Sequence, residues 1–139
     1  MTDAGRLQDR VAVVTGADSG IGRAIAEAFA RAGADLIIVY HSDDAGAGET
    51  LASVQRVGRR GVLRQLDVRD QRAVAELFDR PVEGLRVPFI VVNSAGVGGG
   101  GQPVAETEGA AWDRVIRTDL YGPFYCCRHF MQARKAEGG

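Results

Sequence analysis

Three glycines are the first residues in the sequence whose positions point to chemistry. Gly16, Gly20 and Gly22 follow the apolar run VVT and open a segment with apolar residues at helical spacing. Glycine lets the chain leave a strand tightly, and without a Cβ it lets phosphate oxygens approach the backbone. The N-terminus of the helix would add unpaired N–H groups and a partial positive charge, with Asp18 or Ser19 as its cap. The spacing therefore predicts a pyrophosphate site.

Two alternatives to this site have to be weighed. The glycines could form a tight turn that binds nothing, although the strand before them and the helix after them make that less favourable. A nucleoside triphosphate loop needs Lys and then Ser or Thr after its last glycine. Arg23 and Ala24 stand there instead, so the sequence favours the pyrophosphate site.

Polar residues also follow two later apolar runs. Asp67 comes after GVLRQL at 61–66, and Asn93 comes after FIVV at 89–92. In a doubly wound sheet, ligands bind beyond the carboxyl ends of the strands, where the strand order reverses. Asp67 could simply end a strand and Asn93 could be a turn residue. Their shared position with the glycine turn favours a common ligand site.

Alternating elements must position these residues. Apolar runs and helical spacing predict strands over 10–15, 36–40, 61–66 and 89–92, and helices over 21–32, 43–57, 70–80 and 108–136. This order with short connections predicts an α/β fold, a parallel doubly wound sheet with helices on both faces, in a single domain over 1–139. The third strand is the less apolar and should lie nearer an edge. The fourth has no polar face and is typical of a central strand.

The motifs together resemble the classical short-chain dehydrogenase/reductase family. TG-x-x-x-GIG at Thr15–Gly22, Asp67-Val68, NSAG at Asn93–Gly96 and WDRVIRTDLYGPF at Trp112–Phe124 follow the family's order, with Ser94 replacing an Asn. The resemblance covers essentially the whole chain and implies the N-terminal, cofactor-binding half: a Rossmann-type sheet truncated after the fourth strand and its long helix. It also implies an NAD(P)-dependent oxidoreductase that moves hydride between a nicotinamide and a secondary alcohol or ketone.

The resemblance further implies which residues bind the cofactor, with Asp67 at the adenine. They are Gly16, Asp18, Ser19, Gly20, Ile21, Gly22, Tyr40, His41, Asp67, Val68, Asn93, Ala95 and Gly96. NAD users of the family place an acid at the position of Tyr40, and NADP users place a base at that of His41. The sequence therefore favours NADP(H) over NAD(H), although an ordinary His is only partly charged at neutral pH. His41 as a plain loop residue is an equal alternative.

The family's acid–base residues are missing from this chain. Its chemistry needs a Ser and a Tyr with Lys four residues later, but none of the three tyrosines has that Lys. Asp119 stands where the family has a catalytic Asn, and Pro123 leaves the backbone carbonyl of Asp119 without its helical N–H partner. That carbonyl could hold a relay water, or Pro123 could mark an ordinary kink. We expect the chain alone to be inactive.

Two other classes of function stay open. The chain could be a cofactor-binding module or pseudoenzyme, or an assembly subunit that forms a homo-oligomer through the helix over 108–136. A net charge of −1 and the lack of a long apolar run exclude general nucleic-acid and membrane binding. The adjacent Cys126 and Cys127 do not have metal-ligand spacing, so we expect no metal and a reduced pair in a cytoplasmic protein. The sequence does not define the alcohol or ketone.

Overall fold

Four parallel strands form the sheet of the computed structural model, which describes residues 5–80, 82 and 84–139. In chain order they are β1 (Val11–Thr15), β2 (Asp35–Tyr40), β3 (Gly61–Gln65) and β4 (Ile90–Val92). Their order across the sheet is β3-β2-β1-β4, so the chain reverses direction across the sheet after β3. The predicted doubly wound fold and its strands are confirmed.

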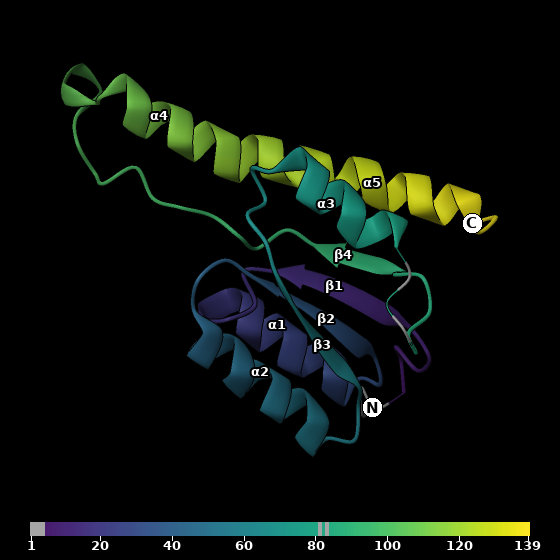
Figure 1. Cartoon of the computed structure of the whole chain (residues 1–139). Coiled ribbons are helices and arrows are strands. Elements are labelled where there is room, and N and C mark those ends of the chain that lie inside the picture. Colours follow the sequence, from purple (N-terminus) through teal and green to yellow (C-terminus); the bar gives the residue numbers. More distant parts are fainter. Residues whose placement is uncertain (1–4, 81, 83) are drawn as a thin grey trace.

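Helices cover both faces of this sheet (Figure 1). On one face lie α1 (Gly20–Arg31) and α2 (Asp44–Arg56), and on the other lie α3 (Gln71–Asp79), α4 (Gly109–Ile116) and α5 (Gly122–Ala136). A short 3₁₀ turn at Val104–Glu106 precedes α4. Among the described residues, no helix is long and apolar enough to cross a membrane.

The core has two layers because side chains alternate along each strand. Toward α3 and α5, strand residues pack with Phe78 and Cys126. Toward α1 and α2, they pack with Ala26, Ala30 and Val54. Every residue of β1 and β2 is buried, whereas β3 and β4 are partly exposed. The edge position predicted for β3 is confirmed, and β4 also lies at an edge of the described sheet.

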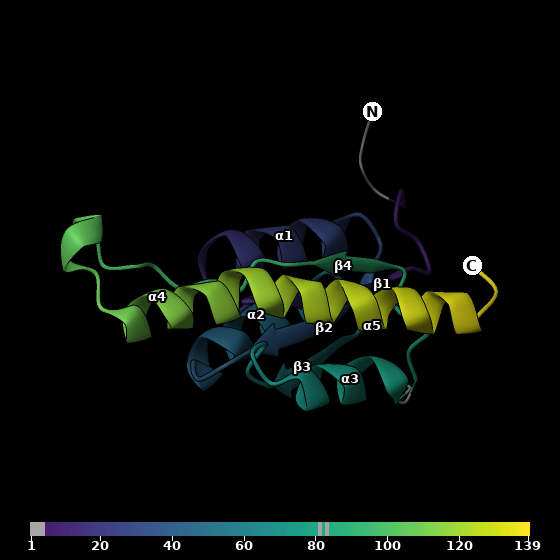
Figure 2. The ribbon, with the colours of Figure 1, turned by 90° about the horizontal axis from the view of Figure 1, so that it is seen from above.

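The long helical segment runs along the whole molecule but is not regular (Figure 2). Between α4 and α5 the turn Arg117–Tyr121 is π-helical, and the N–H of Gly122 donates to the carbonyl of Arg117. Pro123 follows directly and cannot donate a backbone hydrogen bond. A π turn next to a proline is a recognised way for a helix to absorb a missing bond. The predicted disturbance at Pro123 is therefore present, as a widened turn within one continuous path.

Candidate functional site

A cavity of about 590 Å³ opens beyond the carboxyl ends of the strands. It lies between the glycine turn after β1, the segments that follow β2, β3 and β4, and the long helix. Among the residues predicted to bind a cofactor, all but Asn93 line it. The structure thus gathers residues from four separate turns at the place where a doubly wound sheet binds its ligands.

The glycine turn owes its shape to two close approaches and one opening. A Cβ on Gly16 would lie 2.8 Å from the Cα of Ala95, and a Cβ on Gly22 would collide with the carbonyl oxygen of Gly16. At Gly20, by contrast, no atom lies within 4 Å of the Cβ position, and φ is +52°. Gly16 and Gly22 therefore allow close packing, whereas Gly20 leaves backbone exposed to the cavity. That cradle fits a phosphate group.

The start of α1 differs from expectation in one side chain. Ser19 is the N-cap residue, but its hydroxyl makes no capping hydrogen bond. Ile21, one of the residues predicted to bind the cofactor, is 76% exposed and lines the cavity. The first turn of α1 therefore presents an uncapped end and an apolar side chain to whatever occupies the cavity.

Side chains outside the predicted set hold the glycine turn in place. One Arg23 nitrogen donates to the carbonyls of Asp18 and Gly46, at 2.7 and 3.1 Å. The buried hydroxyl of Thr50 donates to the carbonyl of Ala17 at 2.7 Å. Both contacts tie the turn to α2, so the cradle is fixed before any ligand arrives.

Thr15 has a positioning role that the sequence analysis did not assign to it. Its hydroxyl oxygen accepts the N–H groups of Ser94 and Ala95, at 3.1 and 3.0 Å, and it lies 3.4 Å from the carbonyl oxygen of Val92. The residue is 1% exposed. It therefore fixes the turn after β4 against the end of β1. The sequence indicated this role only by placing a polar residue at the end of an otherwise apolar strand.

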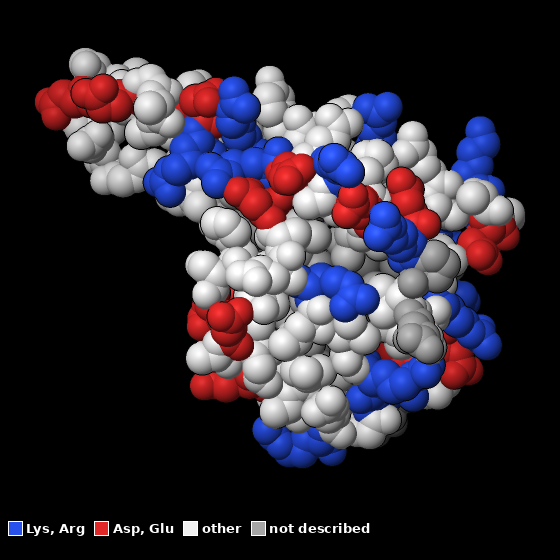
Figure 3. Space-filling view, in the orientation of Figure 1, with Lys and Arg blue, Asp and Glu red and all other residues white. Residues whose placement is uncertain are grey.

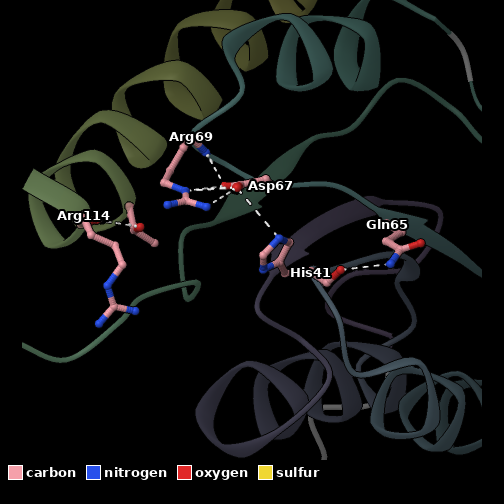
Figure 4. Close-up of polar contacts among 6 residues, drawn as sticks. His41, Gln65, Asp67, Arg69 and Arg114 are labelled. Carbon is pink, nitrogen blue, oxygen red and sulfur yellow. Dashed lines mark hydrogen bonds and ion pairs between the residues drawn. The ribbon is translucent and has the colours of Figure 1, made fainter. Parts of the chain in front are cut away.

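An acid, an arginine and a histidine meet at the corner beyond β2 and β3 (Figure 4). The Asp67 carboxylate accepts from the backbone N–H and the guanidinium of Arg69, and its Oδ2 lies 3.8 Å from His41 Nε2. The hydrogen bond from the Arg69 side chain is the main reason that the pKa of Asp67 is lowered. Asp67 is thus ionised and paired. Arg69 also lines the cavity and was not among the predicted residues.

The Tyr40 phenol stays protonated at neutral pH. Its pKa is raised, first by a hydrogen bond with Asp44 and then by desolvation. Its backbone carbonyl accepts the N–H of Leu66 at 3.0 Å, which ties the ends of β2 and β3 together. The phenol therefore stays neutral and has a structural place beside the cavity.

Comparisons with known proteins identify the family. A family model described as "Enoyl-(Acyl carrier protein) reductase" matches residues 16–139. The "Short chain dehydrogenase/reductase dpmpG" of Macrophomina phaseolina is 34% identical over 142 residues, covering 99% of this chain and 81% of that protein. This chain belongs to the short-chain dehydrogenase/reductase family.

Longer members of the family are similar over one half only. A "3beta-hydroxysteroid dehydrogenase" of Mediterraneibacter gnavus is 35% identical over 135 residues, which are 97% of this chain and 49% of that protein. The crystal structure of carveol dehydrogenase from Mycobacterium avium in complex with NAD has a TM-score of 0.90 and 31% identity, covering 97% of this chain and 53% of that one. The chain spans about half the length of both.

Asp119, which the motif resemblance matched to the family's Asn, anchors the loop after β4. Its Oδ1 accepts the N–H of Val97 at 2.8 Å, and Val97 lines the cavity whereas Asp119 does not. The side chain thus has a positioning contact in this chain. Asn93 differs from the prediction, because its amide lies 3.4 Å from Cys127 Sγ and the residue is absent from the cavity lining. The turn after β4 aims it at α5 instead.

Acidic and basic side chains both line the cavity. Arg114 of α4 lines the cavity and donates to the carbonyl of Gly98 at 3.4 Å. Lys and Arg side chains gather along the underside of the projecting helical segment (Figure 3). Among the described residues, no group of three or more His, Cys, Asp or Glu could hold a metal ion.

Proposed function

We propose that this chain binds a nicotinamide dinucleotide in the cavity and forms the cofactor-binding half of an oxidoreductase. The open backbone at Gly20, between two glycines that permit close packing, is the observation that carries this proposal. The pyrophosphate would lie on the N-terminus of α1, where N–H groups and the helix dipole favour negative charge. The NAD named in the carveol dehydrogenase structure supports this class of ligand.

Each strand end would then hold one part of the cofactor. Asp67 and Val68 would lie at the adenine, His41 at the adenosine ribose, and Ala95 and Gly96 along the path to the nicotinamide. When bound, the nicotinamide supplies the hydride chemistry. The chain's own contribution is orientation: Thr15 holds the turn after β4 against the end of β1.

The proposed reaction is hydride exchange with a secondary alcohol or its ketone. The 3β-hydroxyl in the name of one relative is a secondary alcohol, which supports this class. The sequence lacks a Tyr with Lys four residues later, so the proton would have to be moved by groups outside these residues. A cofactor-binding module without catalysis is the second candidate.

We propose NADP(H) as the preferred cofactor. Tyr40, with its raised pKa, is neutral where NAD users of the family carry an acid. His41 is next in the sequence, and its side chain is 67% exposed beside the cavity. A neutral residue and a potential cation at this point suit a phosphate on the ribose better than free hydroxyl groups.

Replacement of Gly20 by Val tests the binding proposal. The new side chain would fill the opening that is reserved for phosphate, and a residue with φ of +52° would also be strained. We expect NADP(H) affinity measured by calorimetry to fall at least ~100-fold, since both effects act at the pyrophosphate.

Gly48→Ala is the matched control, because Gly48 also has open space at its Cβ position but lies within α2 and outside the cavity lining. It should bind like the unchanged chain. Wild-type affinity in a folded Gly20→Val protein would contradict the assignment of the site.

A further inference from the structure

The corner beyond β2 and β3 brings one acidic and two basic side chains together. Arg69 contacts both carboxylate oxygens of Asp67: its backbone N–H and Nε reach Oδ1 at 2.9 and 3.0 Å, and its Nε and terminal nitrogen reach Oδ2 at 3.0 and 2.6 Å. His41 Nε2 lies 3.8 Å from the same Oδ2. All three residues line the cavity.

This ion pair changes the electrostatic environment of an anion that enters the cavity. An unpaired carboxylate in the cavity wall would repel a phosphate, but here the guanidinium cancels that charge at contact distance. The side chains of His41 and Arg69 are 67% and 38% exposed, whereas that of Asp67 is 29% exposed. The two basic groups therefore face the solvent of the cavity more than the acid does. The second terminal nitrogen of Arg69 takes no part in the bonds to Asp67 and keeps its donors.

We propose that Arg69 is a cofactor-specificity residue, which cancels the charge of Asp67 so that a ribose phosphate is accepted, and that His41 adds a second cation only when it is protonated. The inference rests on the proposed dinucleotide binding and deepens it. Preference for NADP(H) over NAD(H) then depends on an ion pair after β3, not only on the residue after β2.

Other ionisable groups surround His41 and enter the same balance. Asp43 and Asp44 follow it in the chain, where Asp43 caps α2 through the N–H of Gly46 and Asp44 bonds Tyr40. Asp18 of the glycine turn lines the same cavity, and Arg114 lines it from α4. Near neutral pH the cavity therefore contains acids and bases in near balance. One added proton on His41 then changes the net charge of the cavity substantially.

Proton uptake on binding is the direct consequence. An ordinary imidazole is mostly neutral at pH 7.5, and a phosphate monoester is then mostly a dianion. Placing the dianion beside His41 favours the charged imidazole, so NADP(H) binding should take up protons. NAD(H) lacks the phosphate and should take up none through this residue.

Calorimetry of the full chain in buffers of different ionisation enthalpy measures this uptake. We expect a fraction of a proton per NADP+ bound by the wild type and none for NAD+. His41→Gln keeps a polar side chain but does not titrate, so the uptake should vanish. Equal proton uptake in the wild type and His41→Gln would overturn the role of His41.

A double-mutant cycle tests the role of Arg69. We measure the ratio of the dissociation constants for NAD+ and NADP+ in Arg69→Gln, Asp67→Asn and the double variant. Arg69→Gln should lower the preference for NADP+ by about five- to tenfold, since it leaves the Asp67 charge uncancelled. In the Asp67→Asn background there is no charge to cancel, so Arg69→Gln should lower the preference for NADP+ much less.

Arg72→Gln is the control, because Arg72 pairs with Glu76 on the exposed side of α3 and lies outside the cavity lining. An equal loss from Arg69→Gln in both backgrounds, or no loss in either, would overturn the inference while leaving dinucleotide binding intact. If the wild type binds neither dinucleotide, the proposed function fails together with it. Matching melting temperatures would show that each variant is folded.

Discussion

At the scale of single residues, neighbours in the sequence have very different environments. Cys126 is buried in the layer beneath α5, whereas Cys127 is exposed and contacts Asn93. Burial is the main reason that the pKa of Cys126 is raised to about 12, with the charge of Cys127 as the second cause. The thiolate is the reactive form of cysteine, so the two residues should differ in reactivity.

Thiol titration of the folded chain tests this difference. At pH 8 we expect Cys127 alone to react rapidly with a disulfide reagent, and both cysteines to react after unfolding in guanidinium chloride. Cys127→Ser should leave no rapidly reacting thiol in the folded state. Two rapidly reacting thiols in the folded wild type would show that the layer around Cys126 opens readily.

The same pKa shift predicts how stability depends on pH. Folding raises the pKa of Cys126, so the unfolded chain loses this proton near pH 8.5 while the folded chain keeps it to about 12. The contribution of the buried thiol is complete below that range and is lost as the pH rises through it. Urea unfolding should therefore show a fall in stability above about pH 9, and Cys126→Ala should reduce that fall.

At the scale of elements, the sequence was informative where one local pattern decides the structure. Apolar runs bounded by glycine or polar residues located all four strands, and the glycine spacing identified the turn after β1. Contacts between distant segments could not be predicted in this way. Thr15 meets Ser94 and Ala95 across 79 and 80 positions, and only the pairing of β1 with β4 brings them together.

The remaining differences also have local physical causes. Arg69 reaches Asp67 because the chain turns immediately after β3, and the letters DVR do not specify that turn. Pro123 indicated an irregular helix, but whether it kinks or widens depends on packing against neighbours. The orientation of Asn93 toward Cys127 also depends on packing, because α5 lies beside the end of β4.

Thr15→Val measures what the contact between β1 and the turn after β4 contributes. The shape is kept, but the N–H groups of Ser94 and Ala95 lose their acceptor in a part-buried site. We expect a loss of about 2 kcal/mol in the free energy of unfolding, together with weaker dinucleotide binding because Ala95 would shift. Thr15→Ser keeps the hydroxyl and should lose much less of both. Equal losses in the two variants would show that the hydroxyl contributes no more than the methyl group does.

At the scale of the whole molecule, two apolar features are incompletely covered by the described residues. β4 pairs only with β1, and its three apolar residues are partly buried. Natural edge strands are usually charged, bulged or covered. On the long helix, Leu120, Phe124 and Met131 are 58%, 56% and 61% exposed. They are spaced at i, i+4 and i+11, which places them on one face of a helix.

Self-association through this helical face is the last prediction. Burying a contiguous apolar face is the main driving force for association, so sedimentation velocity should show concentration-dependent oligomers of the isolated chain. Phe124→Glu changes the centre of the face at an exposed position and should shift the distribution toward monomer without lowering the melting temperature. Val104→Glu is the matched control, since Val104 is 93% exposed in the turn before α4 and apart from that face. If both variants associate like the wild type, the open side of β4 is the contact, and the helix face is not. A monomer at every concentration would show that neither feature needs a partner.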